Sequence, residues 1–294
     1  MTWIGFTLFA AFMQAIRTAA QKSLSAHISA LGVTYVRYLF GLPFVVIYLT
    51  WLSVDFTAVG AATNTVWLWI LVGGVAQIMA TWALVSVFRW HNFAVGTTFA
   101  KTEALLAALL GTLFFGLTLT MGAWVSVLIG VSGMLVLTWP KEARQLRAWL
   151  SPATLLGMMS GLCFAINALL IHYSTRQFAL PPIHAAAVVL CSMIVMQIAV
   201  MSVWMMAREP SVFRRIALHW RPGLFVGLTS ALGSIGWYSA MSLQNPALVK
   251  TLGLVEFIFV LVITWRVFRE RISAREWLGM ALILLGVAVV MRLG

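Results

Sequence analysis

Charged residues are scarce in this chain, and their scarcity excludes an ordinary soluble domain. Of the 294 residues, 9% are charged and 62% are hydrophobic, whereas a soluble domain carries about 25% charged residues. The net charge of +12 comes from basic residues in short loops between apolar runs. Such loops leave no room for a nucleic-acid-binding domain. We therefore predict an all-α integral membrane protein whose partner is the lipid bilayer and not nucleic acid.

Residues typical of metal and hydrolytic sites are scarce as well. The two cysteines, Cys163 and Cys191, both lie inside apolar runs, which argues against a disulfide framework or a metal site. The single aspartate is Asp55, and the sequence has no HExxH motif and no G-x-S-x-G elbow. An intramembrane enzyme is therefore disfavoured. No Walker-type loop is present, so ATP drive would need another chain, and we expect no cofactor and no metal.

Ten apolar runs are long enough to cross a bilayer, since a hydrocarbon core needs roughly 20 apolar residues per helix. We predict ten transmembrane helices at 3–21, 31–51, 65–88, 93–116, 121–139, 153–175, 181–206, 222–243, 246–268 and 275–292. The first run begins at Trp3 without a basic segment before it or a small-residue cleavage site after it. We interpret it as the first span and not as a signal peptide.

The basic residues predict the orientation of these spans. With ten spans, one side of the membrane receives thirteen lysines and arginines: Lys22, Arg89, Lys141, Arg144, Arg147, Arg208, Arg214, Arg215, Arg221, Arg266, Arg269, Arg271 and Arg275. The other side receives Arg176 and Arg292. Because cytoplasmic loops carry the excess of basic residues, we predict an inner (plasma) membrane protein with both termini outside.

Two parts of the chain match each other at an offset of 153 residues without gaps. The matched pairs include Asn92 with Asn245, Thr98 with Thr251, Glu103 with Glu256, Trp124 with Trp277 and Gly133 with Gly286. This match predicts a first repeat at 1–140, a cytoplasmic linker at 141–152 and a second repeat at 153–294. Five helices per repeat is an odd number, so the second copy enters the membrane from the opposite side. Many secondary transporters are built from such inverted repeats.

Both repeats contain an apolar helix with a glutamate, a short polar turn and a glycine-rich last helix. They read Glu103-Ala104-Leu105-Leu106 through Trp124 to Gly133, and Glu256-Phe257-Ile258-Phe259 through Arg269-Glu270-Arg271-Ile272 to Gly286. This pattern resembles the EamA-type repeat of the drug/metabolite transporter superfamily over nearly the whole chain. The first copy lacks the glutamate that Glu270 supplies in the second turn. The length and the many aromatic residues are most similar to the YddG-type exporters of aromatic amino acids.

The repeated glutamates are the main candidates inside the membrane. Glu103 and Glu256 lie about ten residues into their predicted helices, roughly 15 Å deep. They could bind a proton or an amino group, or hold the two repeats together through hydrogen bonds. Lys101 precedes Glu103 by two residues, so the two side chains cannot both face one cavity squarely. Lys250 follows Asn245-Pro246, a capped helix start that could trap a carboxylate, unless the lysine snorkels to the outer surface.

The other candidates for substrate binding are uncharged polar or aromatic residues within the spans: Gln14, Gln77, Trp82, Thr98, Asn167, Trp237, Tyr238 and Thr251. Each amide could equally form a hydrogen bond between helices, and each aromatic ring could equally fill a packing gap. Arg17 and Arg37 lie nearer the cytoplasmic ends of their spans, where we expect them to snorkel to the interface.

Together these features predict a secondary transporter or exporter that works by alternating access. We expect it to act as a monomer without an obligatory protein partner. The ionisable residues within the spans leave an excess of two positive charges: Arg17, Arg37, Lys101 and Lys250 against Glu103 and Glu256. That excess suits a substrate with a carboxylate, and the resemblance implies an aromatic or bulky apolar amino acid. Another metabolite or drug class of the superfamily is the alternative, and a channel is a third. The fifth and tenth helices are expected to be peripheral supports.

Overall fold

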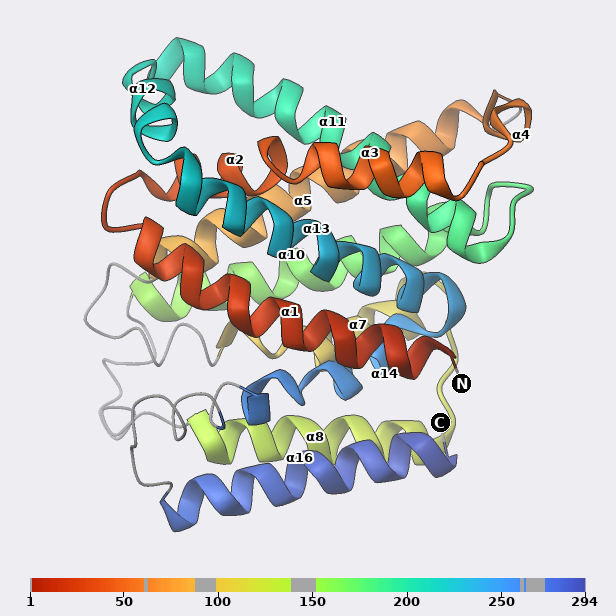
Figure 1. The fold of residues 1–294 in the computed structure, drawn as a ribbon. Helices are drawn as coiled ribbons and strands as arrows, with labels where there is room; N and C mark the ends of the chain where they lie inside the picture. The colour runs from red at the N-terminus through yellow and green to blue at the C-terminus, as the bar shows by residue number, and fades with distance from the viewer. Residues whose placement is uncertain are drawn as a thin grey trace.

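The computed structural model describes residues 2–60, 63–87, 99–138, 152–259, 262 and 273–293, and within these ranges it is helical with no strand. The helices lie roughly alongside one another in layers (Figure 1). Their bounds are α1 (Thr2–Leu24), α2 (Ala30–Leu39), α3 (Leu42–Trp51), α4 (Phe56–Gly60), α5 (Asn64–Val87), α7 (Glu103–Phe114), α8 (Met121–Thr138), α10 (Pro152–Thr175), α11 (Pro182–Arg208), α12 (Ser211–Leu218), α13 (Trp220–Leu243), α14 (Pro246–Gly253) and α16 (Ala274–Leu293).

The helix lengths agree with a chain that crosses a membrane several times. Six segments of the described ranges are long and apolar enough to span a bilayer: Ala30–Trp51, Asn64–Val87, Pro152–Thr175, Pro182–Arg208, Trp220–Leu243 and Ala274–Arg292. Each coincides with a predicted span to within a few residues. The two chain ends lie at the same end of the bundle (Figure 1), as an even number of crossings requires. The count of ten and the inverted arrangement stay predictions.

The predicted span at 31–51 is confirmed as an apolar segment long enough to cross a bilayer, but a turn at 40–41 divides it into α2 and α3. α2 starts at an N-cap, where the Ser29 hydroxyl oxygen accepts a hydrogen bond from the Gly32 N–H at 3.1 Å. Pro43 lies in the first turn of α3. Proline has no N–H to bond to the preceding turn, so the helix ends before it and a new one begins.

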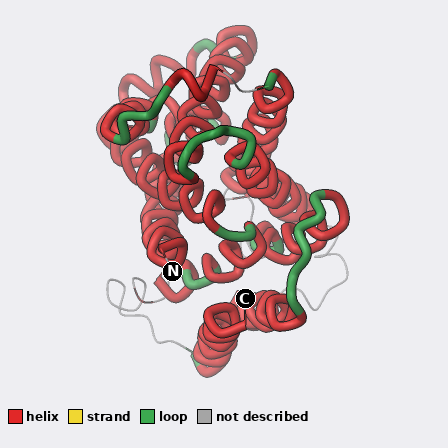
Figure 2. Tube along the Cα trace, turned by 90° about the vertical axis from the view of Figure 1, so that its right-hand side faces the viewer, coloured by secondary structure: helices red, strands yellow, loops and turns green. Residues whose placement is uncertain are grey.

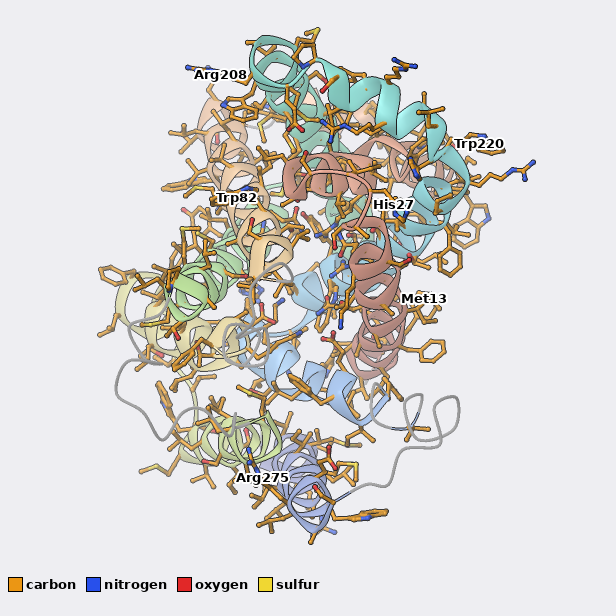
Figure 3. The ribbon with its side chains drawn as sticks, turned by 90° about the vertical axis from the view of Figure 1, so that its left-hand side faces the viewer. Met13, His27, Trp82, Arg208, Trp220 and Arg275 are labelled. Carbon is orange, nitrogen blue, oxygen red and sulfur yellow. The ribbon has the colours of Figure 1, made fainter. Side chains whose placement is uncertain are left out.

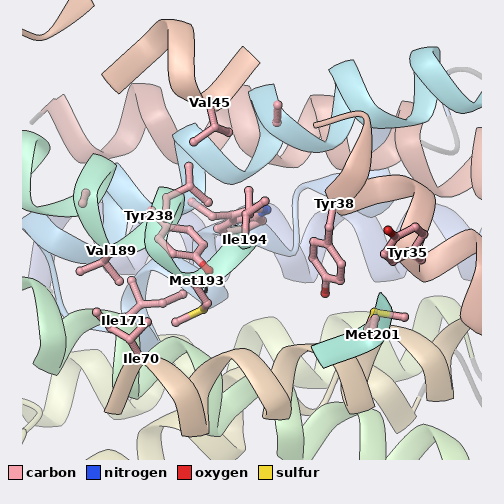
Figure 4. Packing of buried hydrophobic residues seen from close by; sticks show 14 of the residues in the cluster. Tyr35, Tyr38, Val45, Ile70, Ile171, Val189, Met193, Ile194, Met201 and Tyr238 are labelled. Atoms are coloured by element: carbon pink, nitrogen blue, oxygen red, sulfur yellow. Dashed lines mark hydrogen bonds between the residues drawn. The ribbon is translucent and has the colours of Figure 1, made fainter. Parts of the chain in front are cut away.

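The main helix pairs join the first half of the sequence to the second. α1 packs on α13, α5 packs on α10, and α7 packs on α14 (Figure 1). The largest buried cluster also mixes the halves, since it contains Tyr38 of α2 as well as Met193 of α11 and Tyr238 of α13 (Figure 4). The two halves therefore share one interior and do not form separate domains.

α8 and α16, the predicted fifth and tenth helices, lie as a pair at one edge of the bundle (Figures 1 and 2). They run antiparallel, because Arg275 at the start of α16 donates from Nε to the Val136 carbonyl near the end of α8 at 2.6 Å. Glycines allow the close approach: a Cβ at Gly133 would lie 2.7 Å from the Ile283 nitrogen, and one at Gly286 would lie 2.9 Å from the Gly130 nitrogen. Small residues serve this purpose between membrane helices.

Candidate functional site

The two repeated glutamates each begin a helical segment just after a tightened turn. Before Glu103, the Thr102 N–H bonds the Phe99 carbonyl, three residues back, at 3.2 Å. Before Glu256, Val255 bonds Leu252 in the same way at 3.1 Å. The turns cover 101–102 and 254–255, which are equivalent at the offset of 153. The prediction of uninterrupted helices through both glutamates is therefore wrong in the described residues, although 93–98 and most of 260–268 lie outside them. Such i→i+3 turns inside a helix often mark a hinge.

Each glutamate is bound by a lysine from the other half of the chain. Lys101 Nζ donates to Glu256 Oε2 at 2.6 Å, and Lys250 Nζ donates to Glu103 Oε2 at 3.2 Å. The two ion pairs thus link the halves crosswise. Lys250 of α14 binds Glu103 at the start of α7, and Glu256, which follows α14, binds Lys101, which precedes α7. The positive charge of both lysines is balanced inside the protein.

Lys250 lies in an aromatic environment. Its side chain is 8% exposed, and Nζ lies 4.6 Å from the centre of the Trp237 ring and 5.7 Å from that of Phe164. Rings at these distances attract a cation through their negative faces. Asn245 caps α14 as predicted, by accepting a hydrogen bond from the Ala247 N–H. The interpretation of Lys250 as a lysine that snorkels to the surface is wrong, because a carboxylate and two rings hold it in the interior.

Gln14 of α1 connects the two ion pairs. Its Nε2 donates to Glu256 Oε2 at 2.7 Å, and its Oε1 accepts from the Trp237 Nε1–H at 2.9 Å. Because the Trp237 ring also faces Lys250, a continuous chain of contacts runs from the Lys101–Glu256 pair through Gln14 and Trp237 to the Lys250–Glu103 pair. These residues form the candidate site.

Three other predicted residues form hydrogen bonds among helices further along the bundle. Gln77 Oε1 accepts from Gln197 Nε2 at 2.8 Å and from the Tyr238 hydroxyl at 3.3 Å. Asn167 Nδ2 donates to the Gly73 carbonyl at 2.9 Å, and Tyr238 also contacts the Met193 sulfur (Figure 4). These contacts favour the interhelical role that the sequence left open for Gln77 and Asn167.

Two further predicted residues, Thr251 and Trp82, join neither group through a hydrogen bond among the described residues. Thr251 donates from its hydroxyl to the Ala247 carbonyl of its own helix at 2.7 Å. Trp82 is half-buried on α5 and packs against the main core (Figure 3). Thr98 lies outside the described residues.

Two buried arginines complete the polar interior, and the prediction that they snorkel to the interface is wrong. Arg17 is 3% exposed and Arg37 is 4% exposed, so neither snorkels. Arg37 donates from Nη1 to Thr81 Oγ1 at 2.9 Å and, more weakly, from Nη2 to Ser234 Oγ at 3.5 Å. One signal was available: Gln14, Arg17 and Gln21 follow a three- and four-residue spacing and share one face of α1.

Long apolar helices with buried ion pairs between them are typical of a multi-pass membrane transporter. The profile of the EamA-like transporter family matches residues 1–139 and 151–292. The chain therefore belongs to the EamA-like transporter family, whose members move small molecules across membranes and are not enzymes.

Comparison with solved structures supports the fold. A structure titled "Crystal structure of protein" is similar to this chain with a TM-score of 0.77 and 17% sequence identity. The alignment covers 98% of this chain and 96% of the other. At that identity the likeness shows the fold alone. No curated protein matched the chain.

Proposed function

We propose that this protein is a secondary transporter of the inner membrane that exports an amino acid with an aromatic or bulky apolar side chain. It works by alternating access, in which two inverted repeats exchange conformations around a central site. Its basic loops face the cytoplasm and both termini face outward, in agreement with the distribution of lysine and arginine.

The observation that carries this proposal is the crossed arrangement of the ion pairs. Each half supplies the cation for the other half's glutamate, and both glutamates follow equivalent i→i+3 turns. A movement of one half against the other has to rearrange both pairs together. A structural element that switches between two discrete states needs two alternative arrangements of the same charged groups.

The aromatic residues around the site support the choice of substrate. Trp237 and Phe164 face Lys250, and Phe257 lies 5.6 Å from Lys101 Nζ. A ring of the substrate stacks well on such side chains. The resemblance to aromatic amino acid exporters points to the same substrate class.

The test is counterflow in proteoliposomes, with radiolabelled tryptophan, phenylalanine and threonine, each with and without a pH gradient. We expect saturable transport of the two aromatic amino acids, exclusion of threonine and no signal in protein-free liposomes. A response to the gradient would show proton coupling, and its absence would show facilitated exchange. Failure of all three substrates would refute the amino-acid assignment and direct the search to other metabolites and drugs.

A further inference from the structure

Arg17 and Arg37 are buried cations, and neither forms an ion pair with a carboxylate of the described residues. In the described part of the chain every acidic side chain is bound elsewhere: Glu103 by Lys250, Glu256 by Lys101 and Gln14, Glu209 by Ser29 and Arg215, Asp55 by Thr57, and Glu276 by Ser273. The excess of two positive charges therefore resides on the arginines and not on the lysines. An ionised group in the membrane interior without a partner is costly, so such groups mark functional sites.

Unused hydrogen-bond donors lie at the same place. Arg17 Nε and Gln21 Nε2 are fully buried and have no hydrogen-bond partner among the described residues. No hydrogen bond or ion pair of the Arg17 side chain is formed within the described ranges. The hydrogen bonds of Arg37 there go to neutral hydroxyls, those of Thr81 and Ser234, and its guanidinium also lies 5.3 Å from the centre of the Tyr38 ring. The two guanidinium groups repel each other electrostatically, and the charges of Glu256 and Glu103 attract Arg17 through space without forming an ion pair with it. An oxyanion between them would satisfy the donors and remove the repulsion.

The surroundings of the arginines limit the size and shape of that anion. Arg17 follows Gln14 by one turn of α1, a rise of roughly 4.5 Å. On α13, Ser234 precedes Trp237 by one turn in the same way, and Trp237 is bonded to Gln14. Arg17 therefore lies about one helical turn from Gln14 on α1, and Ser234, which binds Arg37 of α2, lies about one turn from Trp237 on α13. A small molecule with a carboxylate at one end and an apolar ring at the other matches this spacing.

We propose that Arg17 and Arg37, with Gln21 and Thr81 beside them, form a subsite that binds the carboxylate of the transported molecule. Seen from the Lys101–Glu256 pair, the subsite lies on the far side of Gln14. Both lysine–glutamate pairs therefore stay intact when the substrate binds. This inference rests on the proposed function for the identity of the substrate, but binding of a carboxylate can be measured without transport.

The test is thermal unfolding of the purified full chain in detergent, with four probes. Tryptophan carries both charged groups, indole-3-propionate lacks the amine, tryptamine lacks the carboxylate, and inorganic phosphate is an oxyanion without a ring. We expect tryptophan and indole-3-propionate to raise the Tm of the wild-type protein in a saturable manner and tryptamine to leave it unchanged. Equal stabilisation by tryptamine, or stabilisation by phosphate alone, would overturn the carboxylate assignment without any variant.

Variants then assign the effect to the arginines. Arg17→Gln and Arg37→Gln should each raise the half-saturating concentration of indole-3-propionate roughly tenfold or more, since each loses a charged hydrogen bond. Arg17→Lys keeps the charge but not the bidentate geometry, so it should bind with intermediate affinity. Arg214→Gln, at an exposed position of α12, is the matched control and should bind like wild type. Unchanged affinity in both glutamine variants would overturn the subsite.

The two proposals fail differently. If indole-3-propionate stabilises the protein through the arginines while no amino acid is transported, the subsite stands and the amino-acid assignment falls. If tryptophan is transported saturably while the arginine variants keep wild-type affinity, the transporter assignment stands and the subsite falls.

Discussion

The two crossed ion pairs have the same chemistry but different surroundings. In the Lys250–Glu103 pair both side chains are less than 10% exposed, and Trp237 and Phe164 cover the lysine. In the Lys101–Glu256 pair the lysine is 14% exposed, and the carboxylate has a second donor in Gln14. The first glutamate thus depends on one lysine, whereas the second has two partners.

This difference shows which part of the site follows the internal repeat. Glu103 and Glu256 are equivalent at the offset of 153, but the lysines are not, because Lys101 precedes its neighbouring glutamate by two residues and Lys250 precedes its own by six. The repeat therefore places the acids. The positions of the two lysines follow from a different requirement, the neutralisation of a buried carboxylate from the opposite half. Any nearby position on the facing segment can supply that positive charge.

The largest effect is expected from Lys250→Met, which breaks the enclosed pair. Glu103 would remain buried without its cation, and the free energy of unfolding should fall by about 3–5 kcal/mol. Titration of the detergent-solubilised protein with SDS measures this loss. The double variant Lys250→Met with Glu103→Gln removes both charges and should recover most of the stability. A double variant as unstable as the single one would show that the lysine acts through packing alone.

Lys101→Met should have a smaller effect in the same measurement. Gln14 still donates to Glu256, and the more exposed position lets water replace part of the lost contact, so we expect a loss of about 2 kcal/mol. Equal losses for Lys101→Met and Lys250→Met would contradict the distinction between the two pairs.

Gly253→Ala tests the aromatic cover of Lys250. A Cβ at Gly253 would overlap the indole ring of Trp237, which lies against the backbone of α14 at this point. Displacing the ring in a packed interior should cost about 1–3 kcal/mol. Gly5→Ala in α1 is the control, because nothing lies within 4 Å of a Cβ there. If both substitutions were neutral, the ring would not be fixed over the lysine.

Trp237→Phe should have the smallest effect, because it keeps a ring beside Lys250 and removes the N–H that binds Gln14. Hydrogen bonds between membrane helices contribute roughly 0.6–1.7 kcal/mol, and we expect a loss of stability in that range. Trp204→Phe on the exposed face of α11 should leave the free energy of unfolding unchanged. A loss at Trp237 no larger than at Trp204 would mean that Gln14 does not couple the two pairs.

Much of the fold could be predicted from the sequence, because apolar run length decides which segments cross a bilayer. The repeat also pointed to Glu103 and Glu256, and helix-capping chemistry predicted the start of α14 at Asn245. The break between α2 and α3 was missed, although Pro43 was a visible signal for it.

The pairing within the site could not be predicted in the same way. The lysines and glutamates that meet are 155 and 147 residues apart, so their contact depends on how the halves pack. The turn before Glu103 has no glycine or proline within it. Arg17 and Arg37 were misplaced because a long side chain near a helix end can snorkel or turn inward, and only the neighbouring helices decide which.

Alternating access requires the two halves to separate and close during transport. The rings of His27, after α1, and His219, at the start of α13, lie 4.9 Å apart at one end of the bundle, where His27 is visible in Figure 3. These histidines lie outside the candidate site, and each belongs to a different half of the chain. Linking the two positions would hold this end closed.

The most direct measurement uses His27→Cys with His219→Cys in a protein whose Cys163 and Cys191 are replaced by alanine. A short, reducible thiol cross-linker joins the two positions in proteoliposomes, and counterflow of the amino acid carried by the unmodified protein is then measured. The single-cysteine variants, treated with the same reagent, are the controls. We predict that cross-linking reduces counterflow to the level of protein-free liposomes and that reduction restores it. Counterflow that continues unchanged in the cross-linked protein would contradict alternating access between the two halves.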